Sequence, residues 1–300
     1  MVGPPRSGDR HARGPARGGV RDAAGRGPCA GVGGWRHGLA RFAAEFGEAF
    51  LPTRCLGCGR AGAGGGGAVV CPRCRTRLPE LPRPRCPRCH HPALVAGAAC
   101  PFCADWPALV AAARSVTPFT EPGRELVHAL KYQGWTSVAD WMGERMARLV
   151  ALETDVVRRE GPAGEGGAPA GPIAVVPVPT TPARLRERGF NPAALLARGL
   201  AAYLRVSLVE TLRRPREAPR QVGLQPAERA ANVRDAFVLD GARIGSLQQT
   251  HVLLVDDVLT TGATALEAAR ALAGCGVRRV TLVTFARALP TGPDADEFRP

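Results

Sequence analysis

The sequence predicts an α/β domain with a parallel sheet, preceded by a small module that metal ions stabilise. Short apolar, β-branched runs at 173–178, 252–255 and 279–285 are typical of strands that are buried on both faces of a parallel sheet. Helical patterns separate these runs, as the crossover connections of such a sheet require. Upstream, most of the 10 cysteines fall into Cys-x-x-Cys pairs, a ligand spacing typical of zinc.

The composition limits the class of protein. A chain of 300 residues has room for one medium domain and a smaller one. No apolar run approaches the ~18 residues of a transmembrane helix, and the N-terminus lacks the apolar core of a signal peptide, so we expect a cytoplasmic protein with no membrane span. In that compartment, clustered cysteines are metal ligands more often than disulfides. The formal net charge is +14, which two four-thiolate zinc sites of charge −2 each would lower to about +10.

Residues 1–34 are expected to form a disordered basic tail, because Gly, Ala, Pro and Arg leave little apolar surface to bury. The tail arginines could contact nucleic acid or simply be solvated, and the sequence does not decide whether this tail is translated in vivo. Residues 35–51 predict a short amphipathic helix that packs on the next module. The apolar residues at helical spacing in it are Leu39, Phe42, Phe46 and Phe50.

A zinc module is predicted over residues 35–106, including that helix. A Cys-x-x-Cys turn places two thiolates on one cation, and two turns complete a closed, structural tetrahedral site. Sequential pairing of the turns is the simplest arrangement, and crossed pairing fits the same spacing. Because so short a segment has little core, two Zn²⁺ ions would supply its folding energy. The expected ligands are Cys55, Cys58, Cys71, Cys74, Cys86, Cys89, Cys100 and Cys103.

Arginines are interleaved with these cysteines. They are expected either to form a nucleic-acid surface or to offset the negative charge of the two zinc sites. The residues concerned are Arg54, Arg60, Arg73, Arg75, Arg85 and Arg88.

The sheet domain is predicted over residues 107–290, followed by a polar tail at 291–300. A strand at 113–119 precedes helices at 122–132 and 138–149. A Gly/Ala/Pro tract then marks 157–172 as a flexible insertion.

A basic segment follows the strand at 173–178, and we expect it to be a loop that ends where Asn191 and Pro192 open a helix to about 204. Ligands of open α/β sheets lie at the carboxyl ends of the strands, so arginines there suit a pyrophosphate group. The candidate residues of this segment are Arg184, Arg188, Gly189 and Asn191. A long polar connection at 213–232, between strands at 206–212 and 233–239, is typical of either a functional lid or a disordered segment.

The most informative segment runs from the strand at 252–255 into a helix at 265–273. A helix N-terminus holds anions, because its amides are unpaired and the helix dipole is positive there. The preceding carboxylates, Asp256 and Asp257, would repel phosphate, so they suit two vicinal hydroxyls or a metal ion. A ribose that carries a 5′-phosphate fits this arrangement. The small residues that would cradle the phosphate are Thr260, Thr261, Gly262, Ala263 and Thr264.

This segment resembles the PRPP-binding motif of type I phosphoribosyltransferases. With three further pieces, the chain resembles the ComF (competence protein F) family over about residues 35–287. The further pieces are Phe50 to Gly59; Leu130-Lys131-Tyr132; and Val176 to Pro179 with Arg188 to Asn191, followed by Gln221, Leu224, Arg229, Asn232-Val233 and Ala236-Phe237. The resemblance implies a type I phosphoribosyltransferase-like fold, a parallel sheet flanked by helices with a hood, behind a double zinc ribbon. It further implies that 188–191 line the cleft and that 213–232, with Gln221, Arg229 and Asn232, form the mobile hood.

The resemblance implies binding of PRPP, or another ribose-5-phosphate ligand, with Mg²⁺. In a Mg-dependent phosphoribosyltransferase, Asp256 and Asp257 would hold the ribose hydroxyls and 260–264 the 5′-phosphate. Arg184 and Arg188, with Mg²⁺, would stabilise the departing pyrophosphate. The sequence does not identify the acceptor or the oligomeric state.

The alternative is a non-catalytic protein. It would be a zinc-ribbon accessory that binds single-stranded DNA beside the competence machinery, or a regulator that senses PRPP. The family is associated with natural competence, that is, with DNA uptake and transformation. This association agrees with either alternative.

Overall fold

The computed structural model describes residues 54–61, 69–92, 100–153, 171–215 and 236–289, which belong to one compact unit, Pro52–Pro300. The predicted tails at 1–34 and 291–300, the predicted helix at 35–51, nearly all of the insertion, and Gln221, Arg229 and Asn232 lie outside these residues. Among the helices that are described, none is long and apolar enough to cross a membrane.

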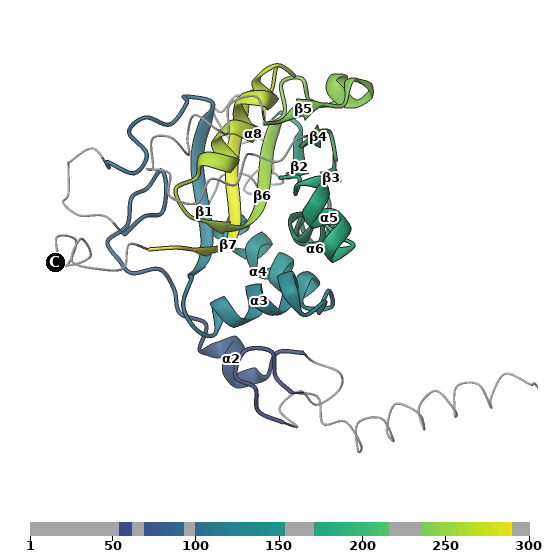
Figure 1. Cartoon of the computed structure of the whole chain (residues 1–300). Coiled ribbons are helices and arrows are strands. Elements are labelled where there is room, and N and C mark those ends of the chain that lie inside the picture. Colours follow the sequence, from purple (N-terminus) through teal and green to yellow (C-terminus); the bar gives the residue numbers. More distant parts are fainter. Residues whose placement is uncertain (1–53, 62–68, 93–99, 154–170, 216–235, 290–300) are drawn as a thin grey trace, which may run out of the picture. The chain divides into compact units, whose positions relative to one another are not determined.

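A five-stranded parallel sheet, in the order β1-β7-β6-β2-β3, forms the centre of this unit (Figure 1). Along β6, Leu253 and Val255 join one apolar cluster while Val252 and Leu254 join another. The sheet is therefore buried on both faces, which is why its strands appear in the sequence as continuous apolar runs. The strands are β1 Val110–Pro118, β2 Ile173–Pro177, β3 Ser207–Leu208, β6 His251–Leu259 and β7 Arg279–Arg287.

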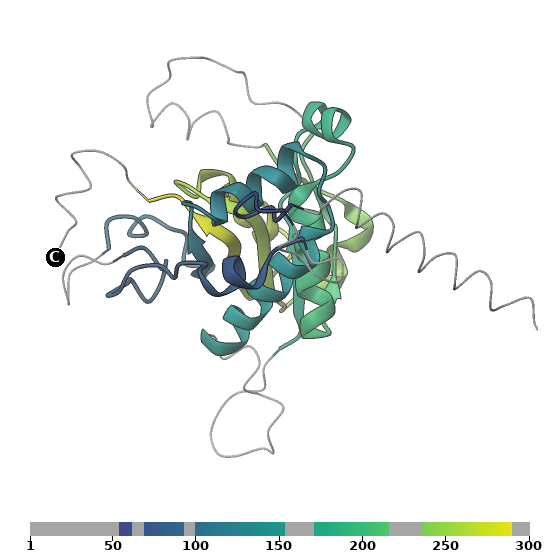
Figure 2. The same cartoon turned by 90° about the horizontal axis from the view of Figure 1, so that it is seen from below.

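Helices cover the two faces. Three of them, α3 Gly123–Tyr132, α4 Val138–Glu153 and α6 Pro192–Leu204, share the cluster of Leu253 and Val255. The fourth, α8 Ala263–Ala273, shares the cluster of Val252 and Leu254. In Figure 2 the teal helices α3 and α4 lie beside the yellow strand β7, which both helices contact.

A close helix crossing fixes the position of α6. A Cβ atom on Gly143 of α4 would lie 2.7 Å from the carbonyl oxygen of Leu196, and one on Gly199 of α6 would lie 3.2 Å from the Cα of Asp140. Only glycine allows the two backbones to approach so closely. The start of α6 confirms the predicted cap, because the side chain of Asn191 accepts a hydrogen bond from the amide of Ala193 at 3.2 Å.

The structure corrects the prediction for the basic segment after β2. It is a helix, α5 Pro182–Arg188, and not a loop. Thr181 caps it by accepting a hydrogen bond from the amide of Arg184 at 3.4 Å, and Gly189 ends it with a φ of 79°. None of the residues of α5 is buried, so the sequence lacks the apolar stripe by which helices are recognised.

The remaining strands differ in length from the prediction. The predicted strand at 206–212 is split into β3 and the short β4 Leu212–Arg213, which pairs antiparallel with β5 Val238–Leu239. A 3-10 helix, η2 Gly241–Leu247, follows β5. β6 is longer than expected, because its pairing with β7 continues to Leu259, so the two aspartates lie inside the strand.

Candidate functional site

The eight paired cysteines form two clusters, and the clusters follow sequential pairing. Within each cluster the sulfurs lie within 4.8 Å of one another. A tetrahedral zinc ion with Zn–S bonds of about 2.3 Å separates its sulfurs by about 3.8 Å. The Sγ–Sγ distances are 3.9 Å for Cys58–Cys71, 3.8 Å for Cys86–Cys103 and 3.7 Å for Cys89–Cys100. The free thiols therefore fit zinc in a first site (Cys55, Cys58, Cys71, Cys74) and a second site (Cys86, Cys89, Cys100, Cys103).

Backbone amides point at the sulfurs in both sites. In the first site, the amides of Gly57 and Cys71 donate to the Sγ of Cys55 at 3.4 and 3.3 Å. In the second, the amide of Cys89 donates to the Sγ of Cys86 at 3.5 Å. Such hydrogen bonds orient metal ligands and stabilise the thiolate form that zinc requires.

Two of the interleaved arginines hold the backbone of the zinc module. Arg88 donates to the carbonyl oxygens of Cys103 at 2.8 Å and of Val110 at 3.0 Å, and also to those of Trp106 and Pro107. Arg75 donates through Nε to the carbonyl oxygen of Val70 at 2.9 Å. These two guanidinium groups have a structural role that the sequence did not indicate.

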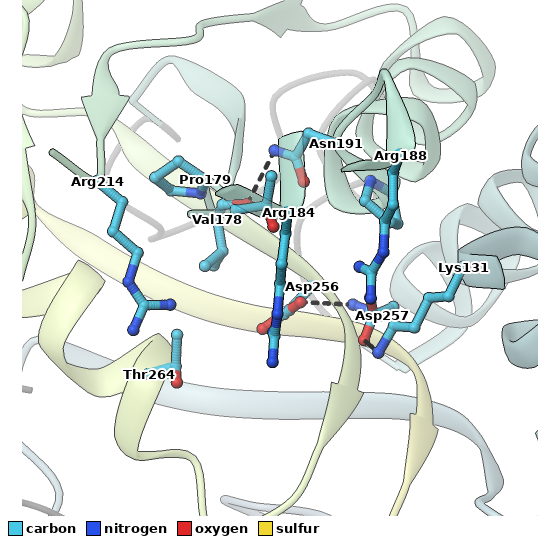
Figure 3. Close-up of a pocket in the computed structure, with 12 residues that line it drawn as sticks. Lys131, Val178, Pro179, Arg184, Arg188, Asn191, Arg214, Asp256, Asp257 and Thr264 are labelled. Carbon is cyan, nitrogen blue, oxygen red and sulfur yellow. Dashed lines mark hydrogen bonds and ion pairs between the residues drawn. The ribbon is translucent and has the colours of Figure 1, made fainter. Parts of the chain in front are cut away.

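A polar cavity of about 160 Å³ lies where β2 and β6 end and α8 begins. It brings together six of the residues that the sequence predicts for the site: Arg184, Arg188, Asn191, Asp256, Asp257 and Thr264. In Figure 3, Arg184 and Arg188 extend from α5 toward the aspartates, Lys131 reaches in from α3, and Arg214 points toward Thr264. The cavity is therefore lined by cationic side chains of α5, of α3 and of the residue that follows β4, and by the carboxylate pair of β6.

The rest of the predicted cradle forms the turn before α8 and is not part of the cavity wall. Thr260 and Thr261 are exposed there, and Gly262, with a φ of 82°, is the residue that caps α8. Ala263 is the first residue of the helix. Gly189 contributes the left-handed end of α5 and no cavity surface.

The acidic pair is electrostatically unequal. The ammonium group of Lys131 lies 2.6 Å from Oδ1 of Asp257. Asp256 accepts a hydrogen bond from the amide of Asp257 at 2.8 Å, yet burial and the neighbouring Asp257 charge raise the pKa of Asp256 to about 7. Near neutral pH, Asp256 is therefore poised to lose its proton when a cation or a hydroxyl donor binds beside it.

One arginine of the cavity has spare hydrogen-bonding capacity. The Nε of Arg188 is buried and has no hydrogen-bond partner among the described residues, although its guanidinium lies 4.8 Å from the ring centroid of Tyr132. A buried donor without a partner is costly, and an anionic ligand in the cavity would satisfy it. This observation fits a phosphate or pyrophosphate group.

Sequence reasoning missed two of the cations. Lys131 is far from the acidic pair along the chain, and only the packing of α3 against β7 brings it to Asp257. Two signals pointed to this lysine without assigning it a role: Leu130-Lys131-Tyr132 is a piece of the family resemblance, and Lys131 ends the apolar face that includes Leu126. Arg214 directly follows β4 and lines the cavity.

A second cavity of about 470 Å³ lies beside the first and shares Lys131 with it. Its walls include Phe119 and the neighbouring rings of His128 and Tyr132, whose centroids are 4.9 Å apart. The two cavities differ in chemistry: the first is charged, whereas the second combines aromatic rings with Val127 and the charged groups of Arg124, Glu125 and Lys131.

The chain matches two known domain families. Residues 170–298 match the "Phosphoribosyl transferase domain" and residues 46–104 match the "Double zinc ribbon domain". A "DNA utilization protein YhgH" of Salmonella typhi is 33% identical over 209 residues, which cover 68% of this chain and 84% of that protein. "Competence protein F" of Haemophilus influenzae is 30% identical over 171 residues, which cover 57% and 70%. "Competence protein ComFC" of Bacillus subtilis is 27% identical over 213 residues, which cover 68% and 77%.

These matches and the geometry define the class: a protein with a phosphoribosyltransferase domain of type I fold behind a double zinc ribbon. Within that class, the chain belongs to the ComF family. The family and the fold that the sequence predicts are thereby confirmed.

Proposed function

We propose that this protein binds PRPP with Mg²⁺ in the polar cavity and transfers its phosphoribosyl group to an acceptor. The observation that carries this proposal is the convergence of a carboxylate pair, several cations and the N-terminus of α8 at one edge of the sheet. Each part of PRPP has a matching partner there: hydroxyls for the carboxylates, a 5′-phosphate for the helix amides, and pyrophosphate for the arginines.

In this reaction the chain acts mainly by positioning and by stabilising charge. The aspartates hold the two ribose hydroxyls, and the amides at the start of α8 with Thr264 hold the 5′-phosphate. As the C1–pyrophosphate bond lengthens, negative charge grows on the leaving group, and Arg184, Arg188 and Lys131, which line the cavity, would stabilise it. Mg²⁺, when bound, supplies further neutralisation of the pyrophosphate, and the oxygens of Asp256 and Asp257 are the ligands that the cavity offers it.

We expect the acceptor to bind in the second cavity. Its aromatic walls suit an apolar or planar molecule, and Lys131 connects it to the polar cavity. A PRPP-consumption assay against a panel of bases and amines tests whether turnover occurs and on what. Consumption with none of them, together with tight PRPP binding, would favour a regulator that senses PRPP.

The binding step is tested by calorimetric titration with PRPP and Mg²⁺. We expect the Asp256→Asn, Asp257→Asn double variant to lose about 100-fold or more in affinity, as when charged hydrogen bonds are removed. A wild-type protein that gives no heat, or a double variant that binds as the wild type does, would overturn the proposal.

The affinity should also depend on pH. Because the pKa of Asp256 is raised to about 7, its carboxylate form grows as pH rises through 7. If binding requires the carboxylate, the affinity for PRPP at pH 6 should be about tenfold weaker than at pH 8. The Asp256→Asn variant should lose this pH dependence, and a wild-type affinity that is constant between pH 6 and 8 would contradict the assignment.

A second function is favoured by the names of the relatives, which refer to DNA utilization and competence. We propose that single-stranded DNA binds the exposed arginines of the zinc module, with an affinity that falls steeply with salt. Arg54, Arg60 and Arg73 are exposed, so their triple change to Ala should weaken binding, whereas Arg75→Ala should act through stability. A salt-independent gel-shift would count against this function.

A further inference from the structure

Arg287 connects the second zinc site to the sheet. It is the last residue of β7, and only 2% of its surface is exposed. Its Nη1 donates a hydrogen bond of 2.6 Å to the carbonyl oxygen of Cys89, the most deeply buried thiol of that site. A buried arginine at this point is held by the zinc module and not by solvent.

Charge explains why an arginine is tolerated in the core. A zinc ion with four thiolates carries a net charge of −2, which needs a nearby cation when water is excluded. The guanidinium of Arg287 is buried beside this site and donates to the carbonyl oxygen of Cys89. Arg287 would therefore offset one unit of the negative charge of the occupied site, and its own buried charge is costly without that site.

The backbone of Arg287 also touches the two segments that build the polar cavity. Its carbonyl oxygen accepts a hydrogen bond of 2.6 Å from the amide of Phe119, just before the helix that carries Lys131. It pairs with Leu259, and the next amide, that of Ala288, donates to the carbonyl oxygen of Leu259 at 2.9 Å. Leu259 is the last residue of β6 before the turn that opens α8.

We propose that Arg287 is a positioning residue through which zinc in the second site holds α3 and the start of α8 in the geometry that binds the phosphoribosyl ligand. Loss of zinc from the second site would leave a buried cation unpaired, and the end of β7 would move to hydrate it. The first site packs in the apolar cluster of α3, whereas α8 belongs to the cluster of the second site. The ligand part of this inference rests on the proposed function, while the coupling between segments does not.

The test compares matched changes at the two sites in the full-length protein. Cys100→Ser and Cys58→Ser each remove the more exposed ligand of one site, and each should lower the zinc content from two ions to one. Hydrogen–deuterium exchange then reports on residues 257–266, which include the start of α8; residues 119–131 do not separate the two sites, because the first site itself packs against α3. We expect exchange at 257–266 to accelerate by about tenfold in Cys100→Ser, as for loss of a typical coupling, and to stay as in the wild type in Cys58→Ser.

Two changes at Arg287 separate charge from packing. Arg287→Met keeps the length of the side chain and removes the charge, and it should reproduce both the faster exchange and a PRPP affinity about tenfold weaker. Arg287→Lys should restore most of the zinc content and of the affinity. A purely structural role would make the two variants equally poor.

The outcomes distinguish the coupling from the ligand. Exchange that is unchanged in Cys100→Ser, or changed equally in Cys58→Ser, overturns the coupling even if the wild type binds PRPP. Faster exchange confined to the second-site variants, in a protein that gives no heat with PRPP, supports the coupling and overturns the proposed function instead.

Discussion

The two zinc sites use the same four-thiolate unit but are attached to the sheet domain by different forces. The first site joins the apolar cluster of α3, α4 and α6, with Val70 and Leu78 buried in it, and leaves Cys58 exposed. The second site joins the opposite cluster, and arginine hydrogen bonds fasten it to the chain that leads into β1 and to β7. Two zinc sites with the same ligands can thus be attached differently, one by apolar packing against the core and the other through a buried arginine.

This difference predicts how each site fails. Where a site is attached by apolar contacts, its loss lowers the free energy of unfolding in proportion to the apolar surface exposed, and the surrounding side chains can repack. Where a site is attached through a buried charge, its loss costs more, because removal of one charged partner leaves the other buried and unpaired. Changes at the second site should therefore cost more than matched changes at the first.

The largest effect is expected from Cys89→Ser. Cys89 is fully buried, and its backbone carbonyl holds the buried Arg287. Loss of the zinc charge beside that arginine should lower the free energy of unfolding by about 3–5 kcal/mol, as for breaking a buried ion pair. Urea denaturation monitored by circular dichroism, with zinc analysis of the same samples, measures this.

Cys55→Ser is the matched change at the first site, where that thiol is as buried as Cys89. It should also release one zinc ion but cost clearly less than Cys89→Ser. Equal losses of unfolding free energy would remove the distinction between the sites.

A smaller effect is expected from Arg88→Ala. Arg88 satisfies carbonyl oxygens of the segment that leads from the second site into β1, including those of Cys103 and Val110. Leaving such groups unsatisfied costs about 1–3 kcal/mol. The matched change, Arg75→Ala at the first site, removes one bond to Val70, so we expect a loss below about 1 kcal/mol. The comparison would be reversed if thermal unfolding ranked Arg75→Ala as the more damaging variant.

Much of this architecture is encoded locally and could be predicted. The strand runs of β2, β6 and β7 are continuous because both faces are buried, and the Cys-x-x-Cys turns carry their ligand geometry in the spacing itself. The aspartates and Asn191 could be placed at the site because strand ends and helix caps have local signals. Thr264 follows from the same turn.

What the sequence could not supply are contacts between distant segments. Lys131 meets Asp257, and Arg287 meets Cys89, only after β1, β6 and β7 have paired. The local sequence does not show that a charged side chain at a strand position is buried, because the residue that it contacts lies far away along the chain. α5 was missed for the converse reason, because an exposed basic helix has the composition of a loop.

The smallest effect on stability is expected from Gly57→Ala, which adds one methyl group at the first zinc site. Gly57 lies in the first site, where a Cβ would come within 3.2 Å of the Cβ and the Sγ of Cys74 and of the Cβ of Pro122, just before α3. Gly57→Ala should keep both zinc ions, because a shift of a few tenths of an ångström relieves these contacts, yet cost about 1 kcal/mol by overpacking. The control is Gly241→Ala, where a Cβ would meet no atom within 4 Å, so stability should change by less than about 0.5 kcal/mol. Loss of a zinc ion in Gly57→Ala would mean that the first site, like the second, depends on its attachment to hold the metal. Retention of zinc with a lowered melting temperature would show that the packing of the first site can be loosened independently of its metal.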